Sequence, residues 1–134
     1  MFTLHPQLAA DTLEVGDFPL CTVRLMNDSS YPWLILVPKR QAIREITDLP
    51  APDVETLWGE ILRAHEALKG LVMPDKMNIG AIGNMVPQLH VHVVARMKGD
   101  KAWPKPVWGF APAVPYTPDA AAERIAALRA QLGL

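Results

Sequence analysis

The chain has 134 residues but only one cysteine, no block of like charge, and no apolar run long enough to span a bilayer. A single cysteine excludes an intramolecular disulfide and favours a reducing compartment. Because Cys21 alternates with apolar residues, we interpret it as a small core residue. We also find no secretory signal, so the expected location is the cytoplasm. With 13 basic and 14 acidic side chains, nothing points to polymeric nucleic acid or a membrane as a partner.

Hydrophobic residues, in contrast, make up half of the sequence, and 13 prolines divide it into short segments. This composition predicts one domain with a packed core over residues 1–134. Alternating or continuous apolar patterns predict strands, and three-and-four spacing predicts helices. The expected strands are 20–26, 33–37, 77–82 and 88–95, and the expected helices are 54–68 and 119–132. The fold class is therefore predicted to be α+β, an antiparallel sheet of about five strands with one long helix packed across it and a C-terminal helix.

The boundaries between these elements follow from turn and capping residues. Val15–Asp17 is predicted to be a turn, Asp53 the N-cap of the long helix, and Gly70 its end. We place the domain core at about 20–96. A Pro- and Trp-rich segment without regular structure follows at 98–118, and the C-terminal helix covers 118–132. The aromatic residues of the Trp103–Trp108 stretch imply that this segment packs against something, as a lid, a dimer brace or a partner-binding strip.

The segment from Gln88 to Val94 reads Gln-Leu-His-Val-His-Val-Val and alternates polar with apolar residues. A period of two is that of a β-strand, so Gln88, His90 and His92 are expected on one face. Neighbours on this face would lie about 6.6 Å apart, which allows one phosphate to contact both imidazoles. The apolar residues between them are expected to anchor the strand in the core.

Further residues accompany this segment in a consistent order. They are Asn78, Gly80, Gly83 and Asn84 upstream, Arg96 downstream, and an apolar strand that ends at Pro38-Lys39. Together with His-Val-His-Val-Val, this arrangement resembles the histidine-triad (HIT) superfamily, whose signature is His-φ-His-φ-His-φ-φ, where φ is hydrophobic. Two positions depart from the family pattern. Gln88 replaces the first histidine of the triad, and Trp33 occupies the place of a further histidine that many members carry.

The resemblance implies a HIT-like fold and a nucleotide hydrolase or transferase that needs no cofactor. His90 would attack the α-phosphate of a phosphoanhydride, phosphoramidate or diadenosine polyphosphate, and water would then release a nucleoside monophosphate. Nucleophilic attack by His90 is reasonable, because an imidazole with a pKa of about 6.5 is largely neutral at pH 7. Its other ring nitrogen is expected to donate to a backbone carbonyl. His92 would donate to a phosphate oxygen or to the leaving group.

The remaining site residues are assigned by the same resemblance. Gln88 is interpreted as a positional support, and Asn27 as a ligand of the ribose. Gly83 and Asn84 would lie near phosphate, and Asn78 is included among the substrate-binding residues. Structural roles in turns or in the sheet are the alternative for each of them. Family members are usually two-fold dimers, and the apolar stripe of the helix at 54–68 is a candidate for that contact.

Two other functions remain open from the sequence. One is a nucleotide-binding protein with little or no turnover, because two imidazoles that the family often uses are absent. The other is a metal-binding His-x-His protein, with His5 and His65 as further histidines, although such a site needs a third ligand. We interpret Arg96 and Lys39 as solvated charges and Trp33 as a core residue.

Overall fold

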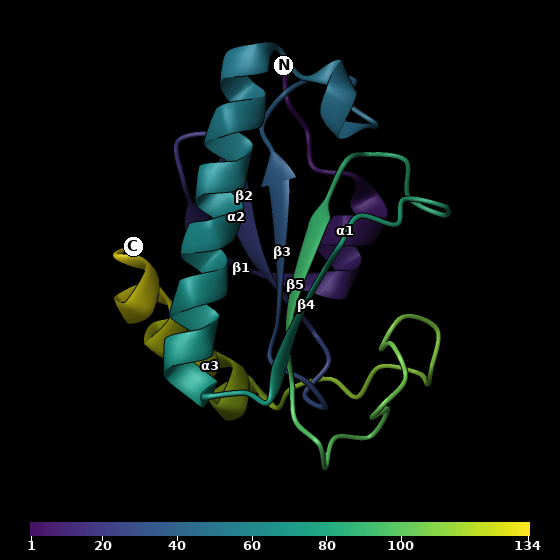
Figure 1. The fold of residues 1–134 in the computed structure, drawn as a ribbon, viewed down its shortest axis with the longest axis vertical. Helices are drawn as coiled ribbons and strands as arrows, with labels where there is room; N and C mark the ends of the chain where they lie inside the picture. The colour runs from purple at the N-terminus through teal and green to yellow at the C-terminus, as the bar shows by residue number, and fades with distance from the viewer.

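A computed structural model describes all 134 residues, and it contains a five-stranded antiparallel sheet with three α-helices (Figure 1). The elements are α1 (Pro6–Asp11), β1 (Thr12–Asp17), β2 (Cys21–Met26), β3 (Trp33–Pro38), a 3-10 turn (Ile46–Asp48), α2 (Ala51–Val72), β4 (Lys76–Gly80), β5 (Val91–Arg96) and α3 (Pro118–Leu132). Neighbouring strands follow the order β1-β2-β3-β5-β4, and each pair is antiparallel. The α+β prediction is confirmed. None of the helices combines the length and the apolar character needed to cross a membrane.

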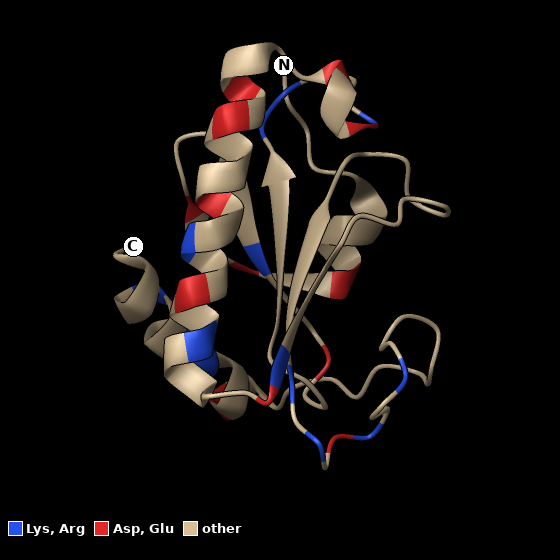
Figure 2. Ribbon diagram, viewed as in Figure 1, with Lys and Arg blue, Asp and Glu red and all other residues tan.

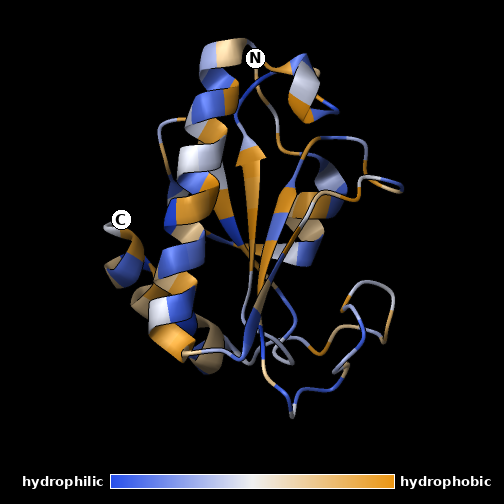
Figure 3. Ribbon diagram, viewed as in Figure 1, coloured by the Kyte–Doolittle hydropathy of each residue, from blue (hydrophilic) through white to orange (hydrophobic).

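One face of the sheet packs against α2 and α3. Its core combines inward residues of every strand except β4 with Leu57, Ile61 and Leu68 of α2. In Figure 3, α2 correspondingly carries apolar residues toward the sheet and hydrophilic residues away from it. The apolar stripe that we considered for a dimer contact is therefore largely used inside the protomer. Trp58 and Leu62, in contrast, remain exposed on the helix.

The other face of the sheet has a smaller core and carries the two histidines. Trp33, Ile35 and Val37 of β3 lie in this core together with Leu8 of α1. The remaining cover comes from the irregular segment between β5 and α3, which contributes Ala102 and Val107. This segment lies on the opposite side of the sheet from α2 (Figure 1). The expectation that the Pro- and Trp-rich segment packs on the domain is thus confirmed.

Several predicted boundaries need correction. Val15–Asp17 is not a turn but the end of β1, where the register shifts between Glu14 and Gly16 as in a β-bulge. A side chain at Gly16 would come within 3.0 Å of the side chains of Arg129 and Leu134, so both would have to shift to make room for it. Asp53 lies inside the first turn of α2 rather than at its N-cap.

The ends of the helices differ in how well the sequence predicted them. Helix α2 continues past Gly70 and ends at Val72, with Met73 in the left-handed conformation. For α3, Thr117 caps the first turn by accepting from the Ala120 amide, and Gly133 ends the helix at a φ of 71°. The bounds of α3, Pro118–Leu132, agree with the predicted range 118–132.

A buried carboxylate joins α2 to the start of β2. Glu60 accepts hydrogen bonds from the backbone amides of Leu20 and Cys21, at 2.9 and 2.8 Å, and its side chain is buried. These bonds satisfy two amides that have no ladder partner at this point, and they fix the helix against the edge of the strand. Cys21 itself is fully buried, and burial raises the pKa of its thiol far above the ordinary value.

We expect Glu60→Ala to lower the free energy of unfolding by about 2–4 kcal/mol, because it leaves two buried amides without acceptors. Urea denaturation followed by circular dichroism measures the loss. Glu55→Ala is the matched control, since Glu55 is exposed on the same helix and should change stability by less than about 0.5 kcal/mol. Equal effects of the two substitutions would contradict a structural role for the Glu60 carboxylate.

Charged residues of both signs are spread over the molecule. Figure 2 shows acidic and basic residues on α2, at strand ends and in loops, without a single-sign cluster covering one element. A ligand that carries phosphate must therefore be held by local donors and not by a general positive field.

Candidate active site

The register of β5 places His90 and His92 on the face opposite to α2. Leu89, Val91 and Val93 point into the core under α2, as predicted. The strand begins at Val91 rather than at Gln88, so His90 lies immediately before it. The two imidazoles are only 7% and 4% exposed, and their ring centroids are 5.0 Å apart.

The ring orientation of His90 is set by a backbone carbonyl. Its Nδ1 lies 2.7 Å from the carbonyl oxygen of Gln88. Because a carbonyl only accepts, Nδ1 must carry the proton, and Nε2 keeps its lone pair. This is the tautomer expected for a nucleophile. His90 also lines a small cavity of about 60 Å³, together with Gly83, Pro87 and residues of the segment that follows β3, including Arg44 and Glu45.

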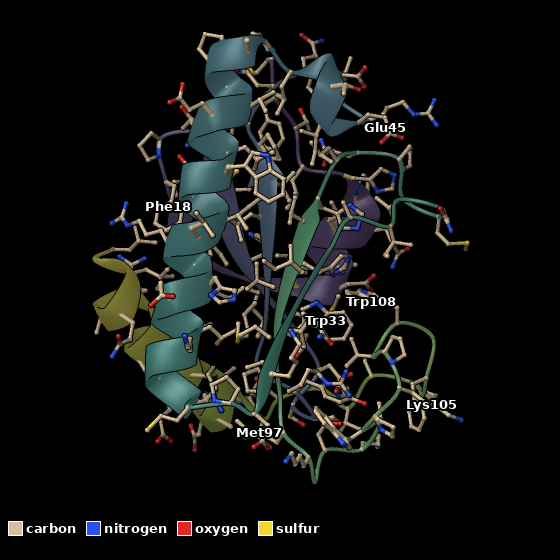
Figure 4. All side chains as sticks on the ribbon, in the orientation of Figure 1. Phe18, Trp33, Glu45, Met97, Lys105 and Trp108 are labelled. Carbon is tan, nitrogen blue, oxygen red and sulfur yellow. The ribbon has the colours of Figure 1, made fainter.

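The opposite tautomer is imposed on His92. The indole Nε1 of Trp33 donates to His92 Nδ1 at 3.0 Å. Since an indole N–H can only donate, Nδ1 is the acceptor and the proton of the neutral ring lies on Nε2. Trp108 packs edge-on against the same imidazole, with centroids 5.4 Å apart. Trp33 and Trp108 lie side by side in Figure 4, and they enclose this part of the strand.

Burial and the neighbouring imidazole of His90 lower the pKa of His92 to about 3. In the unfolded chain His92 has an ordinary histidine pKa of about 6.5. As the pH falls, the unfolded state therefore takes up a proton on His92 before the folded state does. The folded state should therefore lose stability progressively between about pH 6.5 and pH 3. Urea denaturation at several pH values measures this loss. His92→Gln should weaken the pH dependence, and an unchanged profile in that variant would contradict the assignment.

The side chain of Gln88 is committed to the N-terminal segment. Its Oε1 accepts from the His5 amide at 2.8 Å, and its Nε2 donates to the Thr3 carbonyl at 2.9 Å. Gln88 thus supports the site in two ways, through its backbone carbonyl under His90 and through an amide that ties residues 3–5 to the loop. Its place as a positional support agrees with this geometry.

Asn78 and Arg96 form a second polar group on the histidine face. Arg96 is buried, donates to both carboxylate oxygens of Asp100 at 2.7 and 3.0 Å, and also donates to Asn78 Oδ1 at 3.0 Å. The interpretation of Arg96 as a solvated charge is therefore wrong. Asn78 has a structural partner, and its role in substrate binding stays a prediction.

The two remaining glycines of interest lie at the end of β4 and in the loop that follows it. A side chain on Gly80 would come within 3.1 Å of the Trp108 ring, so the indole would have to move back by a few tenths of an ångström. Gly83 has a φ of 66° and lines the cavity beside His90. Asn84 is exposed, makes no hydrogen bond within the chain and does not line that cavity, so its assigned contact with phosphate stays a prediction.

A larger cavity of about 360 Å³ lies next to Trp33. It is lined by Asn27, by residues of α1, and by residues of the segment between β5 and α3, among them Val107 and Gly109. Asn27 Oδ1 accepts from the Tyr116 amide at 2.9 Å, which ties the turn after β2 to the segment before α3. Asp28, rather than Asn27, accepts from the amide two residues ahead and makes the local Asx-type turn.

The metal hypothesis lacks the residues that it requires. No group of three or more His, Cys, Asp or Glu side chains is arranged to hold a metal ion. His5 instead accepts from the Gln7 amide and caps α1, and His65 lies beside Glu66 on α2. His90 and His92 therefore have no third ligand.

Sequence reasoning missed the roles of both tryptophans at the site. Trp33 lies in the core as expected, but the sequence did not predict that its N–H sets the tautomer of His92. Trp108 belonged to a segment of open function, and it forms part of the wall around the imidazoles. The available signal was aromatic residues in a Pro-rich stretch, which predicted packing but not its location.

Comparisons with known proteins agree with this geometry. A family model described as the HIT domain matches residues 7–99. The crystal structure of a histidine triad protein from Marinobacter aquaeolei is 50% identical, with a TM-score of 0.97 over 99% of this chain and 97% of that one. A histidine triad protein from Bradyrhizobium japonicum is 45% identical, with a TM-score of 0.96 over 98% of both chains. One from Sinorhizobium meliloti is 44% identical, with a TM-score of 0.95 over 97% and 96%. No curated protein matches the chain.

Proposed function

Because this chain belongs to the HIT domain family, we propose that it is a nucleotide hydrolase or transferase that uses His90 as its nucleophile. Its substrates would be phosphoanhydrides or phosphoramidates cleaved at the α-phosphate. The observation that carries the proposal is the pair of fixed, opposite tautomers, with the Nδ1 of His90 against a carbonyl and the Nδ1 of His92 against an indole N–H. One ring offers a lone pair at Nε2 and the other offers an N–H.

The first chemical step is attack on phosphorus. The lone pair of His90 Nε2 forms a bond to the α-phosphorus while the bond to the leaving group breaks, and its electron pair goes to that group. The imidazole then carries a positive charge, and the hydrogen bond from its Nδ1–H to the Gln88 carbonyl stabilises this charge. Water next attacks the phosphorus, the bond to Nε2 breaks, and a nucleoside monophosphate is released.

His92 would stabilise the charge that develops during attack. With its Nδ1 occupied by Trp33, its Nε2–H is the available donor toward a phosphate oxygen. The rings are close enough, at 5.0 Å between centroids, for one phosphate group to meet both. The nearby Gly83, in the left-handed conformation, leaves its backbone unobstructed for close approach of a ligand.

We place the nucleoside in the cavity of about 360 Å³ beside Trp33, which has the volume of a typical small-molecule site. Asn27 is the residue there that we assign to the ribose hydroxyls. Its Oδ1 already accepts from Tyr116, so its amide N–H₂ is the end that remains for a ligand.

A nucleotide-binding protein with little turnover is the second candidate function. It is favoured by Gln88, whose amide is engaged with residues 3 and 5 and cannot transfer a proton. Incubation with adenosine phosphoramidate and with diadenosine polyphosphates separates the two. Release of AMP, and a protein mass increased by one adenylyl group in rapidly quenched samples, supports catalysis. Tight nucleotide binding without AMP would establish the binding protein instead.

We also propose that the protein forms a homodimer, as its resemblance to the HIT superfamily implies. Strand β4 lies at the edge of the sheet, and Ile79 on it is partly exposed. On α2, Trp58 and Leu62 are exposed apolar side chains that the protomer leaves uncovered.

Light scattering should give a dimer mass for the wild type at micromolar concentration. Leu62→Glu should shift the population toward monomer by introducing a charge into the apolar contact. Glu55→Gln, an exposed change on the same helix, should leave the mass unchanged. A monomeric wild type would refute the proposal.

A further inference from the structure

The site contains no side chain that can give a proton to a leaving group at neutral pH. For His92 to become cationic, its Nδ1 would need a proton, but that atom already accepts from the Trp33 indole at 3.0 Å. Protonation would turn two N–H groups toward each other in a buried position. Burial and the neighbouring His90 act in the same direction, since they lower the pKa of His92 to about 3.

His5 and the other groups near His92 do not supply the proton either. His5 caps the start of α1, where its Nδ1 accepts from the Gln7 amide, and it does not line the cavity beside His90. Trp108 packs edge-on against the imidazole, and Gly80 lies opposite His92 in the pairing of β4 with β5, and neither titrates. Gln88, at the position before His90, has an amide that does not ionise and is occupied by residues 3 and 5. Its place in the sequence is where the resembled family carries another imidazole.

Two charged groups line the small cavity beside His90, Arg44 and Glu45. A guanidinium does not release its proton in proteins, so Arg44 cannot act as an acid. Glu45 is exposed and makes no hydrogen bond with either imidazole. Figure 4 shows Glu45 on the segment between β3 and α2, away from Trp33 and Trp108.

This arrangement has a consequence for the substrate. Resting on the proposed function, we infer that the enzyme is selective for nucleotidyl anhydrides and related compounds whose leaving group departs from oxygen as a stable anion, and that it turns over phosphoramidates poorly. A phosphate or carboxylate leaves with the electron pair of the broken P–O bond and needs no proton. An amine must be protonated before its P–N bond breaks, because the alternative product is an unstable amide anion.

The atoms balance without an acid. His90 Nε2 forms the N–P bond, the P–O bond breaks, and the leaving oxygen keeps both electrons. Water then attacks phosphorus, the N–P electron pair returns to Nε2, and the proton lost by water goes to solvent. His92 remains neutral throughout and donates only a hydrogen bond from Nε2. Trp33 acts through His92 and is therefore a positioning residue.

A matched pair of substrates tests this selectivity. The para-nitrophenyl ester of AMP and the para-nitroanilide of AMP share the nucleotide and the aryl ring, and they differ in the atom bound to phosphorus. We expect wild-type kcat for the ester to exceed that for the anilide by about 100-fold or more, the size of a general-acid contribution that the site lacks. Diadenosine triphosphate should be cleaved as an anhydride. Comparable kcat values for ester and anilide would overturn the inference alone, whereas no AMP from any of the three compounds would overturn the proposed function and the inference together.

Two further measurements address the role of Trp33. Nitrogen-15 chemical shifts of the His92 ring should show Nε2 protonated and Nδ1 unprotonated from pH 7 to pH 5 in the wild type. Trp33→His provides an imidazole that can pass a proton to Nδ1, so it should raise anilide turnover relative to ester by about 10-fold or more. Trp33→Phe removes the indole donor but leaves His92 buried beside His90 with no group to pass it a proton, so the ratio should rise less than in Trp33→His. A His92 ring protonated on Nδ1 in the wild type would refute the mechanism even if the variants do not fold.

Discussion

His90→Asn should abolish AMP formation from every substrate that the wild type cleaves. Asparagine can keep a polar contact near the Gln88 carbonyl, but the lone pair of its amide nitrogen is delocalised into the carbonyl, so the side chain has no nucleophilic nitrogen to attack phosphorus. Removal of a nucleophile that forms a covalent intermediate typically costs on the order of 10³-fold or more in kcat. Steady-state release of AMP measures this loss, and intact-protein mass spectrometry should show no adenylyl adduct on the variant.

The control for this substitution is His65→Asn. His65 lies on α2 beside Glu66, on the other side of the sheet from His90, and it contacts neither cavity at the site. The same change of residue type should therefore leave kcat within about two-fold of the wild type. Substantial AMP formation by His90→Asn, in a sample that binds nucleotide and unfolds normally, would exclude His90 as the nucleophile.

The sequence predicted the placement of the two imidazoles because that placement depends on local geometry. A strand has a period of two, and the apolar residues between His90 and His92 had to face the core. The same logic predicted β3, a continuous apolar run that is buried on both faces. Gly16 misled the prediction, because glycine marks both turns and bulges, and only the pairing of β1 with β2 separates them.

The details that define the chemistry depend on contacts between distant parts of the chain. Trp33 reaches His92 across 59 residues, through the register of β3 against β5. The Gln88 side chain forms hydrogen bonds with Thr3 and His5, which lie more than 80 residues earlier in the chain. No periodicity in the sequence encodes these pairings. The tautomers of the two imidazoles therefore become visible only in the folded structure.

Arg96 was also misjudged, and the reason is physical. A charged residue at the end of a strand is usually solvated, but Arg96 lies on the histidine face, where the following segment folds back over it. Asp100, four residues later, provides the carboxylate that makes burial acceptable. Both partners are almost fully buried, and the Arg96 guanidinium also donates to the Lys105 carbonyl.

This ion pair organises the segment that covers the site. Asp100 accepts from the amides of Met97, Ala102 and Trp103, so its carboxylate holds the turn closed. The Arg96 side chain and these backbone amides hold the pKa of Asp100 below its usual range. A carboxyl with a lowered pKa stabilises the fold above the ordinary carboxyl pKa and loses that contribution as the pH falls through its folded value. The hydrogen bonds of Asp100 therefore stabilise this turn fully at neutral pH and less in acid.

Arg96→Met should lower the free energy of unfolding by about 3–5 kcal/mol, because it leaves the Asp100 carboxylate buried without its cation. Urea denaturation measures this loss, and Lys98→Met, an exposed change two residues away, should have little effect. The double variant Arg96→Met, Asp100→Leu should lose less than the single one, since no unpaired charge remains. If the single and double variants were equally stable, the penalty would not come from the unpaired carboxylate. The turn would then be held by its apolar contacts with Ala102 and Val107, and the ion pair would have no part in placing Trp108 against His92.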